Sequence, residues 1–344
     1  MNYSNHFCLG IFVVLFISCK SGQVPEQPQR SQDSFTIAFG SCNKHTVKNH
    51  LWDDVLAAKP DVWIWGGDIV YADTDKASEI ARMFDIQKEI PGYKAICEQM
   101  QVIGTWDDHD YGLNDGGEEF ASKAASEQVF LDFMDVPLDS PRREQQGVYT
   151  SHTYDLPEGS VKILVLDTRY FRSALTPSTD KSKRYQPGTY GEGTMLGEAQ
   201  WAWLEEELRN SKANFNILIS SIQFLSNQHG FETWGNFPHE VDKLNNLIEE
   251  SGAEGVIILS GDRHISEFSK ITLPGLSYPL IDFTSSGLTH VYASYSGEPN
   301  PYRIGEVIAE KSFGLLILNI SSNEVHMQMV GDHGKVLNEL TQQY

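Results

Sequence analysis

Basic residues are scarce in this chain of 344 residues. Lysine and arginine total 26 against 47 aspartate and glutamate residues, which gives a net charge of −21. Because proteins bind nucleic acids largely through basic side chains that contact phosphates, this deficit excludes a nucleic-acid polymer as the expected partner. A small anionic ester is not excluded, since bound metal ions invert the potential at a site.

The sequence also lacks an apolar run long enough to cross a membrane. The run at residues 9–18 is short, and the first 18 residues contain no Asp, Glu, Lys or Arg. These features are typical of a secretory signal peptide. Residues 16–19 (FISC) resemble a bacterial lipobox, in which Cys19 is acylated; an ordinary cleaved signal is the alternative. With Lys20 next, we expect an exported lipoprotein, periplasmic or anchored in the outer membrane through Cys19.

Only four cysteines occur in the chain. Cys8 is expected to leave with the signal peptide, and Cys19 to carry the lipid. A disulfide between Cys42 and Cys97 would suit an oxidising compartment. We favour the other interpretation, a metal-bound Cys42 and a buried, free Cys97, because of the residues that surround Cys42.

Three regions are expected: a lipoprotein signal peptide at 1–18, a polar tether at 19–34 and one large folded domain at 35–344. Within the domain, strands are expected at 35–39, 61–65, 102–105, 149–155, 161–167, 215–221, 255–260, 279–283, 313–320 and 324–330. Helices are expected at 51–58, 77–89, 118–134, 197–210 and 238–250. Hairpins mixed with helical crossovers indicate an α/β fold of two packed mixed sheets with helices outside.

Four motifs end strand-like runs with metal-type ligands. They are FGSC at 39–42, WGGDIVY at 65–71, GTWDDHD at 104–110 and LSGDRH at 259–264. Ligands of open α/β sheets bind outside the carboxyl ends of the strands. The four motifs therefore predict one metal centre that is assembled from distant parts of the chain.

The types of ligand in these motifs indicate more than one metal ion. The Cys42 thiolate and the Tyr71 phenolate suit iron or zinc, whereas carboxylates suit calcium, magnesium or manganese. Asp262 and His264 would share one face of an extended segment, with Arg263 pointing the other way. Two neighbouring metals are a common device for phosphoester hydrolysis.

The motif at 104–110 places three carboxylates around one imidazole. Such crowding is costly unless a cation offsets it, so one aspartate is expected to bind metal. His109 would face the substrate as a proton donor, with its pKa raised by a neighbouring carboxylate. An acidic surface turn is the alternative, but the apolar residues before it favour a buried strand end.

The four motifs, in this order, resemble the PhoD-like alkaline phosphatase and phosphodiesterase family of the calcineurin-like metallophosphoesterases. LDTR at 166–169, LGEAQWAWL at 196–204 and SIQ at 221–223 are similar to that family too. The resemblance covers residues 35–291 and implies a four-layer αββα sandwich for the domain at 35–344. It also implies a metal-dependent phosphoric ester hydrolase, although the family's extra N-terminal β-domain is expected to be missing here.

The resemblance assigns roles to individual residues. Cys42, Asp68 and Tyr71 are implied to bind an iron-like ion, with Asp68 bridging to calcium or another divalent ion. Asp108 stands where the superfamily has the asparagine of Gly-Asn-His, and His109 stands where it has its catalytic histidine.

The rest of the implied metal site follows from two further motifs. Asp262 and His264 align with the superfamily's Gly-His-x-His. The family's usual Asp-His-Glu is Asp108-His109-Asp110 here, and the aspartate side chain is one methylene shorter than glutamate. The residues that cap the second metal therefore need not be the family's, and Asn114 is a candidate. Iron and calcium are the expected metals, with zinc, manganese or magnesium as alternatives.

The expected mechanism is direct attack on phosphorus by a metal-bridging hydroxide. His109 would protonate the leaving group, and Arg169 or Arg172 would clamp the phosphate; a structural pair with Asp167 is the alternative. A different function remains open: a catalytically inert surface lipoprotein that binds a phosphorylated ligand or partner. Another is a phosphodiesterase or phospholipase whose leaving group contacts aromatic residues at 226–238.

Replacing Cys19 with serine tests the lipid anchor. Because acylation needs the cysteine thiol, the Cys19→Ser protein is expected to leave the membrane fraction. A Cys8→Ser control, altered in the segment that is removed, is expected to stay in it. Membrane fractionation with mass spectrometry of the N-terminal peptide measures both, and equal membrane retention of the two variants would contradict lipidation.

Overall fold

A computed structural model describes Met1 and residues 33–344. The expected signal peptide, Cys19 and nearly all of the expected tether lie outside the described residues. None of the helices in the described part combines the length and the apolar character that a membrane span requires.

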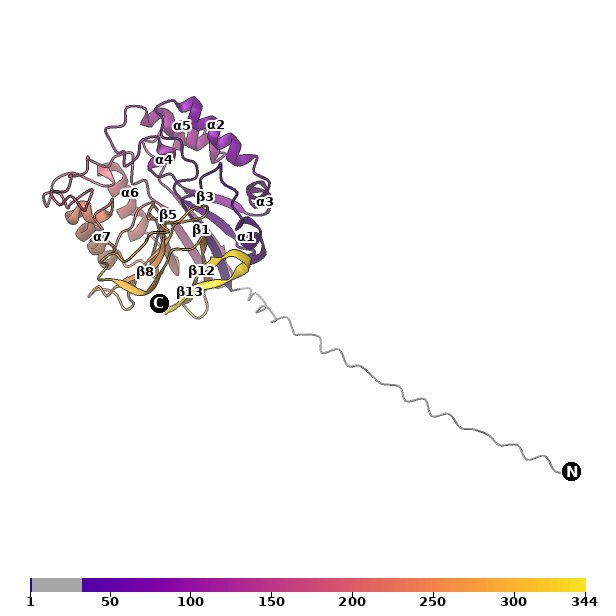
Figure 1. The fold of residues 1–344 in the computed structure, drawn as a ribbon. Helices are drawn as coiled ribbons and strands as arrows, with labels where there is room; N and C mark the ends of the chain where they lie inside the picture. The colour runs from indigo at the N-terminus through magenta and orange to yellow at the C-terminus, as the bar shows by residue number, and fades with distance from the viewer. Residues whose placement is uncertain (2–32) are drawn as a thin grey trace. The chain divides into compact units, whose positions relative to one another are not determined.

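The first of two mixed sheets contains six strands (Figure 1). Their bounds are β1 Ser34–Gly40, β2 Val62–Gly66, β3 Gln101–Thr105, β11 Ser312–Asn319, β12 Glu324–Gly331 and β13 Val336–Gln343. The spatial order is β13-β12-β11-β1-β2-β3. β1, β2 and β3 are parallel, whereas the other pairings are antiparallel.

The second sheet contains seven strands in the order β10-β8-β9-β7-β6-β5-β4. Their bounds are β4 Thr150–Leu156, β5 Gly159–Val165, β6 Phe215–Ile219, β7 Val256–Ser260, β8 Ser266–Ile271, β9 Leu280–Ser285 and β10 Arg303–Ile308. β5, β6, β7 and β9 run parallel, so their carboxyl ends lie at one edge of this sheet.

Helices cover the outer face of each sheet. Outside the first lie α1 Trp52–Ala58, α2 Ala77–Lys88, α3 Pro91–Gln99 and α5 Lys123–Phe133; outside the second lie α6 Gly197–Arg209 and α7 Pro238–Ser251. The remaining helices are the short α4 Asp108–Tyr111 and the 3-10 turns Pro141–Arg143, Trp234–Asn236 and Asp332–Gly334. This arrangement confirms the expected four-layer αββα sandwich.

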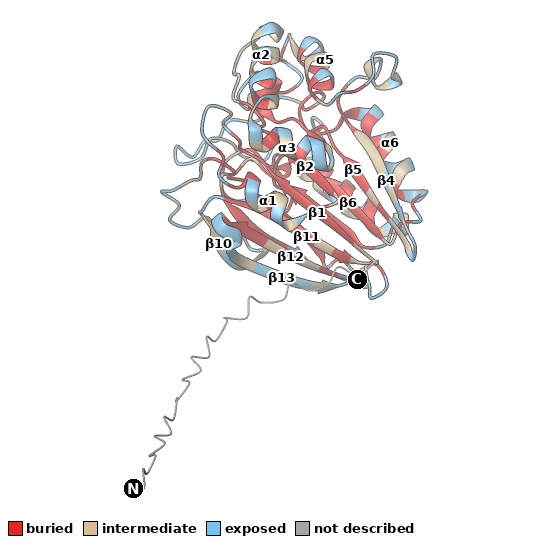
Figure 2. Ribbon diagram, turned by 90° about the vertical axis from the view of Figure 1, so that its right-hand side faces the viewer, coloured by how far each residue is buried: buried red, intermediate tan, exposed pale blue. Residues whose placement is uncertain are grey.

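Alternation along the strands builds the three apolar layers. In β2, Ile64 faces the core between the sheets, whereas Trp63 faces the helices of the first sheet. In β6, Ile217 faces the same inter-sheet core and Leu218 packs under α6 and α7. Because both faces of these strands are buried (Figure 2), a one-residue slip in register would exchange the two faces' side chains between layers.

Five described elements were not predicted, namely α3, α4, β8, β10 and β13. Each is either short or contains so many polar residues that its sequence shows no clear apolar periodicity. β13, for example, reads VLNELTQQ, lies at a sheet edge and has no buried residue, so it lacks the apolar alternation that marks a strand. The expected helix at 118–134 begins later, at Lys123.

Candidate metal centre

The four motifs meet at the carboxyl ends of the strands that carry them. β1, β2 and β3 bring three motifs to the edge of the first sheet, and β7 brings the fourth from the second sheet. Three overlapping groups of potential ligands have their ligand atoms within 4.8 Å of one another: Cys42, Asp68 and His264; Asp68, Asp108 and His109; and Asp107, Asp108 and Asp262. Shared members make these groups one continuous cluster.

The turn after β2 depends on glycine. Gly67 has φ +94°, and a Cβ built on it would lie 2.5 Å from Cβ of Asp107. Asp68 follows with φ 52°, also in the left-handed region. The missing side chain at Gly67 therefore allows two motifs to approach closely enough for their carboxylates to share a site.

Cys42 is fully buried at the end of β1. Its Sγ lies 3.0 Å from Oγ of Ser286 and 3.4 Å from Oδ2 of Asp68. Burial raises the pKa of the Cys42 thiol to about 12, although the Ser286 hydrogen bond opposes this. A cation at this position would be needed to hold the sulfur as a thiolate at neutral pH.

Cys42 and Cys97 are both free, so the structure contains the unpaired Cys42 that we favoured over a disulfide. The prediction that Cys97 is buried is wrong, because this cysteine lies on the exposed face of α3. Its position on an amphipathic helix that was not predicted explains the error.

Tyr71 reaches back to the cluster as expected. Its hydroxyl donates to Oδ2 of Asp68 at 3.0 Å and lies 3.1 Å from Nε2 of His264. Burial, together with the negative charges of Asp68 and Cys42, raises the pKa of the phenol. Three polar groups from two sheets thus surround one point.

The Asp-Asp-His-Asp segment begins the short helix α4. Asp107 is its N-cap, and Oδ1 of Asp110 accepts from the backbone N–H of Asp107 at 2.6 Å. Oδ2 of Asp110 accepts from the backbone N–H of Ile69 at 3.0 Å. Asp110 therefore fastens this motif to the turn after β2, which gives its buried carboxylate a structural role.

Asp107 is a candidate ligand that we did not predict individually. One oxygen accepts from Nε of Arg169 and from Oγ of Ser221, both at 2.6 Å. Burial raises the pKa of Asp107 to about 7, against the opposing effect of the Arg169 charge. The three carboxylates of the motif were the signal in the sequence, but the turn alone could not show which of them point into the site.

His109 lies at the edge of the cluster. Its Nδ1 is 2.7 Å from Oδ1 of Asp73, and its ring stacks on Tyr71 with centroids 4.1 Å apart. Burial lowers the pKa of His109, but the Asp73 hydrogen bond and the charges of Asp68 and Asp108 outweigh it and raise the pKa to about 10. These carboxylates therefore favour the protonated imidazole. Asp73, two residues beyond the second motif, was missed.

Asp262 and His264 converge on the cluster by a different route from the one predicted. β7 ends at Ser260, and both residues have left-handed backbones, with φ 67° and φ 54°. The segment is therefore not extended, and alternation does not apply to it. As a result Arg263, which was expected to point away, lines the same cavity as its neighbours.

The predicted phosphate clamp by Arg169 or Arg172 is not what the structure contains. Arg169 is fully buried, with Nη2 2.5 Å from Asp107 and Nη1 2.6 Å from Glu232. Nε of Arg172 lies 2.9 Å from the other oxygen of Glu232. Both guanidinium groups neutralise buried carboxylates, and neither guanidinium lines the cavity, although Glu232 does. The expected alternative partner, Asp167, instead accepts from backbone groups such as the Arg169 N–H.

The donor set fits metal ions. Asp68 Oδ1, Asp107 Oδ2 and Asp108 Oδ1 are buried and have no hydrogen-bond partner among the described residues. Burial and the charges of Cys42 and Asp108 raise the pKa of Asp68. Such crowded, unpartnered carboxylate oxygens are costly in a protein interior, and cations would stabilise them.

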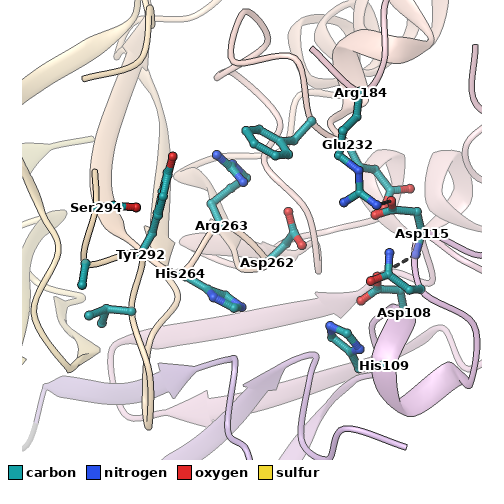
Figure 3. Close-up of a pocket in the computed structure, with 14 residues that line it drawn as sticks. Asp108, His109, Asp115, Arg184, Glu232, Asp262, Arg263, His264, Tyr292 and Ser294 are labelled. Atoms are coloured by element: carbon teal, nitrogen blue, oxygen red, sulfur yellow. Dashed lines mark hydrogen bonds and ion pairs between the residues drawn. The ribbon is translucent and has the colours of Figure 1, made fainter. Parts of the chain in front are cut away.

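Four members of the cluster, Asp108, His109, Asp262 and His264, form the floor of a cavity of about 610 Å³, whereas Cys42, Asp68 and Asp107 are buried and do not line it. Figure 3 shows Asp108, His109 and His264 along one side and Arg263 and Arg184 across from them. Four connections supply the remaining wall, namely α4–α5, β5–α6, β6–α7 and β9–β10. Asn114 is exposed and lines the cavity, so its role as a metal cap stays a prediction.

Two packed mixed sheets with this cluster at their strand ends define a metallophosphoesterase fold. Residues 84–342 match the model of the PhoD-like phosphatase family, and the chain belongs to that family. The matched part begins after Cys42, Asp68 and Tyr71, so the case for these three candidate ligands rests on the geometry given above.

Known relatives are distant in sequence. The chain is 24% identical over 285 residues to alkaline phosphatase D of Bacillus subtilis (strain 168), covering 71% of this chain and 48% of that protein, so it spans about half of the relative's length. A solved structure of PhoD superposes with a TM-score of 0.67 at 18% identity, covering 90% of this chain and 68% of the other. Purple acid phosphatase PPD1 from yellow lupin seeds gives 0.59 at 13% identity, covering 91% and 54%.

Replacing Arg169 with methionine tests its structural role. The change leaves the buried Asp107 carboxylate without its ion-pair partner and leaves Glu232 paired with Arg172 alone. We therefore expect the free energy of unfolding to fall by about 3–5 kcal/mol. Urea denaturation measures this, with Arg209→Met at an exposed ion pair as the control of equal charge change. An Arg169→Met protein of unchanged stability but raised KM would restore the substrate-clamp role.

Proposed function

We propose that this protein is a metal-dependent phosphoric ester hydrolase that acts on small phosphate mono- or diesters. The observation that carries the proposal is the set of unpartnered, buried carboxylate oxygens of Asp68, Asp107 and Asp108, of which Asp108 lines a solvent-open cavity. Membership of the PhoD-like phosphatase family supports it. We further propose export and membrane attachment through Cys19, as the N-terminal sequence predicts.

The ligand types divide the cluster into two kinds of site. Cys42, Tyr71 and His264, with Asp68, would hold an iron-like ion, because thiolate, phenolate and imidazole suit a transition metal. Asp68 and Asp108 would hold a calcium-like ion, because their donors are carboxylate oxygens. Bound there, such cations supply Lewis acidity and an activated water.

The third group, which contains Asp107, Asp108 and Asp262, could hold a further ion of the carboxylate-binding kind. It adjoins the second site through Asp108. Arg169 already offsets part of the charge on Asp107, so this group is less negative than its three carboxylates imply. The primary assignment therefore stays with the two sites that share Asp68.

His109 would act as the proton donor to the leaving group. It lines the cavity, its ring is fixed by stacking on Tyr71, and its Nδ1 is held by Asp73. The hydrogen bond to Asp73 leaves Nε2 as the nitrogen that is free to face a substrate. Asp73 is therefore a positioning residue for the imidazole.

Replacing Asp68 with asparagine tests the metal assignment. Asp68 is shared by two ligand groups, so Asp68→Asn is expected to lower the metal content of the purified protein by at least one ion per chain. Plasma mass spectrometry of the protein after gel filtration measures this, with Asp85→Asn on the exposed side of α2 as the control. Less than one metal per wild-type chain would instead favour an inert, ligand-binding protein.

Replacing His109 with alanine tests the proton donor. We expect kcat to fall by about 100- to 10,000-fold, with a smaller change in KM, because the imidazole acts on the departing oxygen. Asp73→Asn is expected to give a smaller fall, since it removes only the positioning contact. Assays use phenyl mono- and diesters, whose poor leaving group needs a proton, on samples of measured metal content. Unchanged kcat in a fully metal-loaded His109→Ala protein would remove this role.

A further inference from the structure

The wall opposite the metal ligands contains two arginines, Arg184 and Arg263, and no lysine among the described residues that line it (Figure 3). The lining also contains four carboxylates, those of Asp108, Asp115, Glu232 and Asp262. The two arginines differ in exposure. The Arg184 side chain is 53% exposed and pairs with Asp115 at 2.8 Å, whereas the Arg263 side chain is only 8% exposed.

Arg263 is held on two sides. Its guanidinium carbon lies 4.2 Å from the ring centroid of Phe231, and its Nη2 donates to both carboxylate oxygens of Glu298, at 2.8 and 2.9 Å. Phe231 belongs to the β6–α7 connection and Glu298 to the β9–β10 connection. Two separate wall segments therefore fix the plane of one guanidinium group.

The guanidinium group retains donors that nothing in the described protein uses. Glu298 is bound through Nη2 alone, and Nε of Arg263 is buried without a hydrogen-bond partner among the described residues. Nη1 also makes no hydrogen bond to a described residue, but it is not buried, so it is the donor that a ligand oxygen in the cavity can reach.

We propose that Arg263 binds a second negatively charged group of the substrate, a carboxylate or a further phosphate on the leaving-group side of the reacting ester. This rests on the proposed phosphoester hydrolysis. Arg263 lies between Asp262 and His264 in the chain, so its backbone is fixed next to the metal ligands while its guanidinium extends along the wall. The reacting phosphoryl group would occupy the metal floor, and the second anion the arginine.

The lining of the cavity opposes the alternative of a long apolar leaving group. Val291 and Ala293 are its aliphatic members, and the other lining residues are polar, charged or aromatic. Of the aromatic residues expected at the substrate, Trp234 and Phe237 are buried in the core under the second sheet, and Phe231 alone reaches the cavity. A compact, polar leaving group matches this wall better than an acyl chain.

Matched substrates test the proposal. Phenyl phosphate is compared with 3- and 4-carboxyphenyl phosphate, and the methyl diesters of the same compounds are run beside them. The wild-type protein is expected to have a KM for a carboxylated compound about 10- to 100-fold below that of its parent, the range expected of one charge-assisted pairing. Comparing ratios between proteins cancels the intrinsic difference in leaving-group reactivity.

The variants separate a binding role from a structural one. Arg263→Gln is expected to abolish the preference for the carboxylated compound, while KM for phenyl phosphate changes little. Arg263→Lys keeps the charge but loses the planar fork, so an intermediate preference is expected. Phe231→Leu should weaken the preference by loosening the guanidinium. Arg209→Gln, at an exposed pair on α6, is the control of equal charge change and should behave as wild type.

A second measurement keeps the inference independent of turnover. Calorimetric binding of phenylphosphonate and 3- and 4-carboxyphenylphosphonate to the metal-loaded protein reports the same preference without hydrolysis. If no ester is hydrolysed but the phosphonates show an Arg263-dependent preference, the proposed function fails and the anion site stands. The inference is overturned if the wild-type protein shows no preference for the carboxylated compound. It is also overturned if Arg263→Gln and Arg263→Lys, at unchanged metal content, keep a preference as strong as that of the wild type.

Discussion

The burial of like charges at the strand ends is the constraint on which the rest of this structure depends. Asp68, Asp107 and Asp108 carry buried carboxylates into one cluster, which the half-buried Asp262 joins, and water cannot solvate these charges fully. The protein offsets part of the cost with Arg169, which lies behind the cluster and neutralises Asp107. The remaining negative charge requires cations on the cavity side of the cluster. The charge on one side is therefore neutralised by Arg169, and the charge on the other side is left for metal ions.

This division explains the architecture around the site. A shell of backbone hydrogen bonds fixes the loops that carry the ligands, as when Asp110 accepts from Ile69 and Asp107 and holds two motifs together. The two sheets supply a rigid base, because their facing sides share one apolar core. Candidate ligands that come from opposite sheets, such as Cys42 and His264, are therefore held at a fixed separation without direct covalent links.

Periodicity predicted the elements whose apolar pattern is strong, such as β2 and α6, and glycine followed by a ligand predicted the strand ends that form the cluster. Sequence reasoning failed where side-chain direction depends on tertiary contacts. Arg169 follows a strand end and resembles a substrate clamp, but Glu232, distant in sequence, draws it into the interior. Arg263 was expected to point away because the left-handed backbones of Asp262 and His264 leave no trace in the residue pattern.

The floor and the wall of the cavity have different origins in the chain. The floor is made of strand ends, where a shift of one residue would disturb the inter-sheet core, whereas the wall is made of the connections α4–α5, β5–α6, β6–α7 and β9–β10. Gly230 links two of these connections by accepting from the backbone N–H groups of Arg184 and Tyr185, at 2.8 and 3.0 Å. Insertions or exchanges in the wall can therefore change which molecules fit while the metal ligands keep their places, so selectivity can diverge among relatives without re-evolving the reactive centre.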